Sequence, residues 1–244
     1  MQRSAFDGAR RRRIYLFRHG DVSYVNDKGE RVADPKVVPL TDWGRDQARQ
    51  TGELLAEIPF DKAVSSTLPR TIETAEHLLA GRGLDVLQHP GFVEFNADPH
   101  HRNAVTDLNE IAYAFRDALV PGGRYLGGDK FEEVNERVIE ALEDVIADPD
   151  WDTLALVAHG GVNRLMLGWA LGTGLNTFGA FDQNTCCFNI IDVDVDPETN
   201  EILRKFLRAA NVTAYDVPKA GNHLMAMEQI AHRLRAALER EDAR

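Results

Sequence analysis

The sequence predicts an α/β fold, a three-layer α/β/α sandwich with a mostly parallel central sheet and an inserted cap segment. Short apolar runs alternate with longer segments in which apolar residues recur at helical spacing, the pattern of an α/β sandwich. The run 153–158 is nearly all apolar, as expected of a central strand buried on both faces. No repeat or linker divides the chain, so we expect a flexible leader at 1–12 and one domain over 13–244.

The first part of the chain predicts three strands separated by two helices. The strands are expected near 13–18, at 60–64 and at 84–87. Residues 20–39 are rich in Asp, Gly and Pro, which predicts a loop over the end of the first strand. Thr41 is a good N-cap for a helix that runs to about Leu55. Pro69 suits the first turn of a second helix, which should stop at Gly81.

The middle segment, 96–130, is the least regular part of the chain and is expected to form the cap, as a lid or wall over a site. It contains a predicted helix at 107–119. An apolar stripe from Val134 to Val145 predicts the next helix. The remaining elements are expected as a strand at 153–158, a helix at 162–171, strands at 186–195 and 202–212, and an amphipathic helix at 222–240.

Composition and charge limit the classes of function. The chain has 244 residues and a formal net charge of -11, which argues against a nucleic-acid binder, because such proteins need a basic face. No apolar run approaches the roughly 20 residues that span a bilayer. The apolar run behind Arg10–Arg13 is too short for a signal peptide, so we expect a cytoplasmic protein without a membrane partner. Those arginines are expected to be solvated, or alternatively to frame the mouth of a pocket.

The two cysteines, Cys186 and Cys187, are adjacent, which suits neither a disulfide framework nor a zinc site. Their apolar neighbours suggest a strand. We therefore expect at least one of them to pack as a small apolar residue.

Three predicted strands end in residues that can bind or attack a phosphate group. These strand ends are Arg18-His19-Gly20, Ser65-Ser66 leading to Arg70, and His159-Gly160-Gly161. Ligands of open α/β sheets bind beyond the carboxyl ends of the strands, so the three motifs should converge. Arginine matches phosphate oxygens two at a time, and a helix that begins after Gly160 adds free backbone N–H groups. The sequence therefore predicts a phosphate site at this edge.

With these motifs the chain resembles the histidine phosphatase superfamily, also called the phosphoglycerate mutase-like family. The resemblance covers about residues 13–195. The matching blocks are Arg18-His19-Gly20, Leu40-Thr41 with Gly44, Gln47 and Ala48, Ser65-Ser66 with Leu68, Arg70-Thr71 and Glu73-Thr74-Ala75, Gly127-Gly128-Asp129 with Phe131–Val134, and Ala158-His159-Gly160-Gly161.

The resemblance implies a role for each matching residue. His19 is the nucleophile, which forms a phosphohistidine intermediate. Glu94 falls where the family carries its proton donor, which acts as acid and then as base. The resemblance places the phosphoryl group against Arg18, Arg70, His159 and Gly160. Neither a metal nor another cofactor is implied, because the arginines and the second histidine stabilise the charge.

The sequence departs from the family pattern just after the first motif. Val22 stands where the family often has a small hydroxyl residue, which makes Ser23 and Asn26 candidate substrate contacts. The aromatic-Asn pair and the basic run typical of the mutases are not evident. This favours a phosphatase that acts on a small phosphorylated metabolite, with phosphate bound in its pocket. A mutase-type phosphotransferase and a non-catalytic phosphate-binding module remain the alternatives, and a homodimer is left open.

Overall fold

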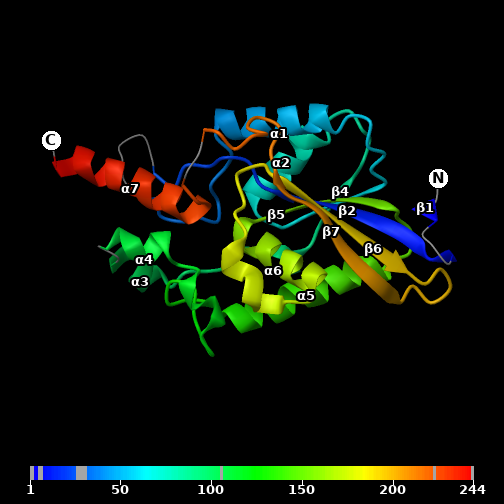
Figure 1. The fold of residues 1–244 in the computed structure, drawn as a ribbon. Coiled ribbons are helices and arrows are strands. Elements are labelled where there is room, and N and C mark those ends of the chain that lie inside the picture. Colours follow the sequence, from blue (N-terminus) through cyan, green and yellow to red (C-terminus); the bar gives the residue numbers. More distant parts are fainter. Residues whose placement is uncertain (1–2, 5–7, 26–31, 105–106, 222–223, 243–244) are drawn as a thin grey trace.

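The computed structural model describes residues 3–4, 8–25, 32–104, 107–221 and 224–242. It confirms the predicted α/β fold, with helices on both faces of a central sheet (Figure 1). The strands are β1 (Arg3–Ser4), β2 (Arg10–Arg18), β3 (Lys62–Ser65), β4 (Val86–Gln88), β5 (Thr153–Ala158), β6 (Phe188–Val195) and β7 (Ile202–Val212).

The sheet is mixed, although a mostly parallel one was expected. Its order is β4-β3-β5-β2-β6-β7, with β1 beside β2. The strands β4, β3, β5 and β2 are parallel, whereas β6, β7 and β1 pair antiparallel. The reason is the tight turn between β6 and β7, where the backbone N–H of Asp196 donates to the carbonyl oxygen of Glu201 and the chain reverses. A parallel pair would need a long crossover there.

The helices follow the predicted order. They are α1 (Asp42–Leu54), α2 (Pro69–Leu78), α3 (Pro99–Ala104), α4 (Leu108–Ala112), α5 (Phe131–Ala147), α6 (Gly160–Leu171) and α7 (Ala226–Asp242), with 3₁₀ turns η2 (Pro90–Phe92), η3 (Arg116–Leu119) and η4 (Gly174–Ala180). Thr41 caps α1, as expected, by accepting a hydrogen bond from the N–H of Gly44. Pro69 is the first residue of α2.

The prediction of a single helix at 107–119 is wrong. The chain forms α4, leaves the helix at Tyr113 and forms η3. This break allows the ring of Phe115 to pack against Tyr125 and Phe178, with ring centroids 5.7 and 5.1 Å apart. Tertiary packing thus overrides the helical pattern of the segment.

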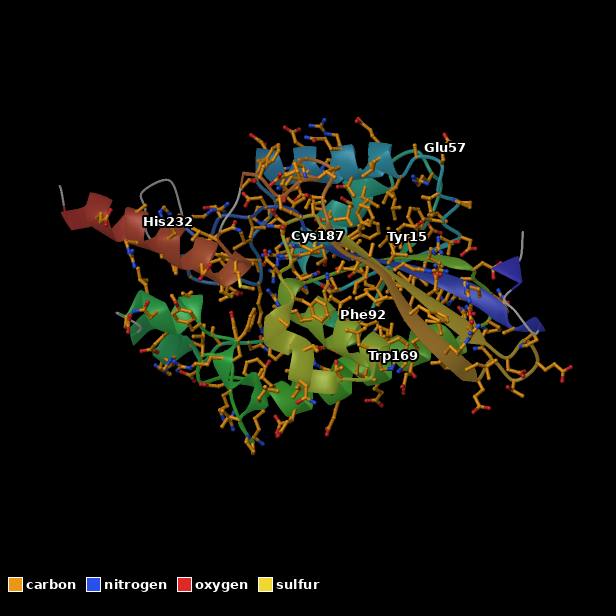
Figure 2. The ribbon with its side chains drawn as sticks, viewed as in Figure 1. Tyr15, Glu57, Phe92, Trp169, Cys187 and His232 are labelled. Carbon is orange, nitrogen blue, oxygen red and sulfur yellow. The ribbon has the colours of Figure 1, made fainter. Side chains whose placement is uncertain are left out.

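The two faces of the sheet bury different side chains. Ile14 and Leu16 of β2 pack in the cluster that contains α5 and α6, whereas Tyr15 and Phe17 pack on the side of α1 and α2. Figure 2 shows Tyr15 and Phe92 in these two separate layers. Every residue of β5 is buried, which confirms that this strand is central.

The leader expected at 1–12 is too long, because β2 already begins at Arg10 and β1 pairs with it. The expectation that Arg10–Arg13 are solvated is also wrong. Arg12 is fully buried, with its guanidinium 3.6 Å from the ring centroid of Trp151, and it donates to the carbonyl oxygens of Trp151 and Ile146. The apolar ring and the free carbonyls compensate for burial of the charge.

The helix α7 lies against the cap, at the end of the molecule away from β1 (Figure 1). Met227, Ala231 and Leu234 of α7 form a small cluster with Ile111 and Ala114 of the cap. This cluster is separate from the two clusters of the sheet. In the described part of the chain, no helix has the length and apolarity needed to cross a membrane.

Candidate active site

His19 and His159 meet at the carboxyl ends of β2 and β5. Both imidazoles are buried, and their ring centroids lie 5.3 Å apart. The backbone N–H of His19 donates to the carbonyl oxygen of Ala158, which fixes the two strand ends beside each other. The structure therefore brings together two of the predicted site residues that are far apart in the sequence.

The hydrogen bond of His19 fixes its tautomer. Its Nδ1 lies 2.7 Å from the carbonyl oxygen of Gly20. Because a carbonyl oxygen only accepts, Nδ1 must carry the proton in the neutral ring, and Nε2 keeps its lone pair. Burial first, and then the charges of Arg70 and Arg18, hold the pKa of His19 well below its ordinary value of 6.5. The lowered pKa favours the neutral form of the imidazole at physiological pH.

His159 is held by Ser66, which comes from the end of β3. The Nε2 of His159 and the Oγ of Ser66 are 2.7 Å apart. Burial, followed by the charges of Arg70, His19 and Arg18, keeps the pKa of His159 well below its ordinary value. Its Nδ1 is buried and has no hydrogen-bond partner in the described structure, which leaves one polar atom of this ring for a ligand.

Arg18 and Arg70 supply the positive charge of the site. Arg18 ends β2 and Arg70 is the second residue of α2, and both are buried. In the described structure the Nε of each lacks a hydrogen-bond partner, although the Nη1 of Arg70 donates to the carbonyl oxygen of Pro35 at 3.0 Å. Buried donors without a partner are costly, so two of them at one site indicate an anion-binding function.

Glu94 lies at the N-terminus of α6. Its Oε2 accepts a hydrogen bond from the backbone N–H of Gly161 at 2.9 Å, and its Oε1 accepts one from the N–H of Phe95 at 3.1 Å. These two hydrogen bonds hold the Glu94 side chain at the first turn of α6. A Cβ on Gly161 would stand 2.6 Å from the Oε1 of Glu94, so glycine is needed there for the carboxylate to fit.

Two further glycines bring the loop behind His19 against α1. A Cβ on Gly20 would lie 2.5 Å from the carbonyl oxygen of Gly44, and a Cβ on Gly44 would lie 2.3 Å from that of Asp21. The N–H of Gly20 donates to Oγ1 of Thr74 in α2. The close backbone contact between Gly20-Asp21 and Gly44, which only glycine allows, fixes the position of His19.

A cavity of about 510 Å³ adjoins the site. Arg70 and Glu94 line it, together with residues from the loop before α1, the cap and α7. The segment 96–130, expected as a lid or wall, contributes Asn96, Ala97, Pro99, Ile111, Tyr125 and Leu126 to its surface.

Ser23, one of the two candidate substrate contacts, does not line this cavity. The Oγ of Ser23 donates to the carbonyl oxygen of Val25, and Ser23 lines a smaller cavity, beside Arg18 and α7. Asn26 lies outside the described residues. The sequence placed Ser65-Ser66 among the three strand ends of the site, but it did not predict the contact between Ser66 and His159.

Arg164 was also missed. It follows Gly160 by one turn of α6 and is buried, and its Nη1 donates to the carbonyl oxygen of Gly160. Burial, and then the charge of Arg18, lowers its pKa to about 10. Its spacing of four residues from Gly160 on a helix was the available signal.

Cys186 and Cys187 are both free and buried beside the site. Each thiol also has a polar contact, because Oγ1 of Thr51 donates to Sγ of Cys186 and Sγ of Cys187 donates to Oε1 of Gln183. Figure 2 shows Cys187 near the centre of the molecule. Burial raises the pKa of each thiol to about 12, so neither forms a thiolate readily. Among the described side chains, no group of three or more His, Cys, Asp or Glu residues could hold a metal ion.

Curated proteins similar to this chain carry the name of a phosphoglycerate mutase. A "Probable phosphoglycerate mutase GpmB" of Salmonella paratyphi A is 31% identical over 162 residues, which are 65% of this chain and 74% of that protein. A protein of the same name from Cronobacter sakazakii is 28% identical and covers 75% of this chain, with 86% of its own length covered.

Solved structures show the same fold. The alpha-ribazole phosphatase of Shigella flexneri superimposes with a TM-score of 0.63 at 24% identity, covering 82% of this chain and 96% of its own. The mycobacterial glucosyl-3-phosphoglycerate phosphatase superimposes with a TM-score of 0.65 at 23% identity, covering 83% of this chain and 99% of its own. Its structure has also been solved in complex with inorganic phosphate.

The family model of the histidine phosphatase superfamily (branch 1) matches residues 14–207. This range contains the site residues Arg18, His19, Arg70, Glu94 and His159. The chain belongs to the histidine phosphatase superfamily.

Proposed function

We propose that this protein is a metal-independent phosphomonoesterase for a small phosphorylated metabolite, acting through a covalent phosphohistidine on His19. The observation that carries the proposal is the neutral His19 ring, with its Nε2 lone pair free, beside two buried arginines whose Nε atoms lack partners in the described structure. This combination supplies both a nucleophile and a cradle for phosphate charge.

In the first step, Nε2 of His19 attacks phosphorus and the bond to the ester oxygen breaks. Glu94 gives its proton to that leaving oxygen. In the second step Glu94 takes a proton from water, whose oxygen attacks phosphorus and releases His19 and phosphate. One difficult displacement is thereby divided into two easier ones.

The remaining residues stabilise the phosphoryl group during transfer. Arg18 and Arg70 direct their free Nε donors at its oxygens, and His159 contributes its unpartnered Nδ1. Gly160 contributes the N-terminal end of α6. Such fixed donors provide most of the catalysis in phosphoryl transfer.

The experiment is the release of phosphate from a panel of phosphomonoesters in the presence of EDTA. We expect turnover that His19→Ala abolishes and that Glu94→Gln lowers by roughly a hundredfold or more. His232→Ala is the matched control, because this imidazole is exposed on α7, and it should leave the rate unchanged. An acid-labile phosphate attached to the wild-type protein, and absent from His19→Ala, identifies the intermediate.

A mutase-type phosphotransferase is the second candidate, favoured by the relatives with 26–31% identity, which are named as probable phosphoglycerate mutases. Transfer of phosphate to a second hydroxyl, with little release to water, would establish it. Phosphate binding without any turnover would establish the non-catalytic module instead. A cytoplasmic location and a homodimer stay predictions.

A further inference from the structure

We propose that the cavity beside Glu94 binds the alcohol part of the substrate, and that this alcohol is a large uncharged group with a substantial apolar surface. The inference rests on the proposed function and names the class of substrate for the same site. A volume of about 510 Å³ lies within the usual range of small-molecule sites.

The position of the cavity assigns it to the leaving group. Arg70 and Glu94 both line it. Arg70 binds the phosphoryl oxygens in the proposed reaction, and Glu94 protonates the ester oxygen. The carbon skeleton behind that oxygen must therefore extend into the space that begins between these two side chains.

The lining of the cavity is mostly apolar and comes from four parts of the chain. Its apolar side chains are Val32, Ala33, Pro35, Leu68, Val93, Phe95, Ala97, Pro99, Ile111, Leu126, Met227, Ile230 and Leu234. The rings of Tyr24 and Tyr125 complete this surface. Burying an ionised or strongly polar alcohol against such a surface costs free energy, whereas an apolar alcohol gains free energy there.

The charges at the cavity do not suit an acidic alcohol. Arg70 and Lys36 are the cations that line it in the described part of the chain. Arg70 belongs to the phosphoryl site, and Lys36 is exposed and close to Asp34, whose Oδ1 accepts from the backbone N–H of Lys36. Carboxylates are usually recognised by paired cationic donors. Among the described residues, a glycerate-like leaving group has no such pair of cations at the cavity.

One wall of the cavity lies outside the match to the family. Met227, Ile230 and Leu234 belong to α7, whereas the matched region ends at residue 207. The Nη2 of Arg233 lies 2.9 Å from Oδ1 of Asp21, and the N–H of Ala226 donates to Asp182, so α7 is tied to the loop after His19 and to the segment before β6. We therefore assign specificity to this helix.

The experiment compares four phosphate esters of primary alcohols, which have leaving groups of similar acidity. They are 3-phosphoglycerate, glycerol 3-phosphate, benzyl phosphate and 2-naphthylmethyl phosphate. We expect kcat/KM to be at least about tenfold higher for the two aromatic esters, a discrimination typical of apolar pockets. Equal values, or a preference for 3-phosphoglycerate, would overturn the inference.

Two variants of α7 test the wall directly. Ile230→Asp places a carboxylate in the cavity, whereas His232→Asp places one on an exposed position of the same helix. We expect Ile230→Asp to remove most of the preference for aromatic esters, because kcat/KM should fall much more for the aromatic esters than for glycerol 3-phosphate. His232→Asp should keep the preference. If both variants lost the preference for aromatic esters to the same extent, the assignment of specificity to the α7 wall of the cavity would be overturned.

The outcomes separate the inference from the proposed function. Release of phosphate that depends on His19 but shows no preference among the esters refutes the inference alone. Release that survives His19→Ala refutes the proposed function. If no ester is hydrolysed, the proposed function fails, and displacement of bound inorganic phosphate by the same four esters tests the cavity. Displacement without preference would then refute the cavity assignment as well.

Discussion

The position of Glu94 depends on a residue with no side chain. Gly161 donates its N–H to the Glu94 carboxylate, and a Cβ there would stand 2.6 Å from Oε1 and 2.7 Å from the Phe95 ring. We expect Gly161→Ala to displace the carboxylate and lower kcat by roughly a hundredfold, the cost of a 1 Å misplacement. Steady-state kinetics would measure it.

The matched control is Gly179→Ala. A Cβ at Gly179 would meet no atom within 4 Å, and this glycine does not have a positive φ. Its kinetics should equal those of the wild type. Normal kcat in Gly161→Ala would show that the geometry at Glu94 is not needed for turnover.

The buried imidazoles make stability depend on pH. The pKa values of His19 and His159 in the folded chain lie well below 6.5, the ordinary value that the unfolded chain has. Below about pH 6.5 the unfolded chain therefore binds more protons, so this contribution to stability is present above that pH and is lost as the pH falls.

Thermal unfolding between pH 5 and 8, in a buffer without phosphate, would measure this effect. We expect the melting temperature to fall toward the acid side, and to fall less steeply in His19→Ala, because one of the two groups is gone. An equal slope in both proteins would contradict the assignment of the effect to His19.

At the scale of elements, a ladder of ion pairs joins β2, β6 and β7. The fully buried carboxylate of Asp192 accepts from Arg13 of β2 and from Arg208 of β7, and Asp194 pairs with Arg11 and Arg204 in the same way. Burial raises the pKa of Asp192, but the hydrogen bonds from Arg13 and Arg208 outweigh it and hold the pKa below its ordinary value.

We expect Asp192→Asn to lower the free energy of unfolding by about 2 kcal/mol, because it leaves two arginines without their carboxylate. Denaturant unfolding would measure the loss. The exposed Asp85 offers the control, and Asp85→Asn should change the value by less than about 0.5 kcal/mol. Equal effects of the two substitutions would show that the ladder adds nothing to stability.

The sequence predicted the strand ends better than the surfaces that the helices cover. Arg18, His19 and His159 were predicted because apolar strands deliver them to one edge of the sheet. Glu94 could be located only through the resemblance to a family, since it follows a short 3₁₀ turn and not the end of a predicted strand. The stripe of α7 predicted a helix, but periodicity does not state which surface a helix packs against.

For the whole molecule, the pair between Arg233 and Asp21 joins α7 to the loop that follows His19. Because the Arg233 side chain is half exposed, we expect Arg233→Ala to loosen α7 without unfolding the sheet. Hydrogen exchange should become faster in α7 and stay unchanged in β2 and β5. Screening by salt should reduce the difference from the wild type.

The control is Arg235→Ala, at an exposed position of the same helix. Its exchange rates should equal those of the wild type. Equal rates in both variants would mean that the cluster with the cap, and not the ion pair, holds α7 in place.

The order of the sheet also has a consequence for synthesis on the ribosome. The strand β2 emerges early, but it lies between β5 and β6, which are made only with residues 153–158 and 188–195. Contacts between such distant segments slow folding. Both edges of β2 along Ile14–Phe17 therefore stay unpaired in nascent chains that stop short of residue 153, and these are the chains that should depend most on chaperones.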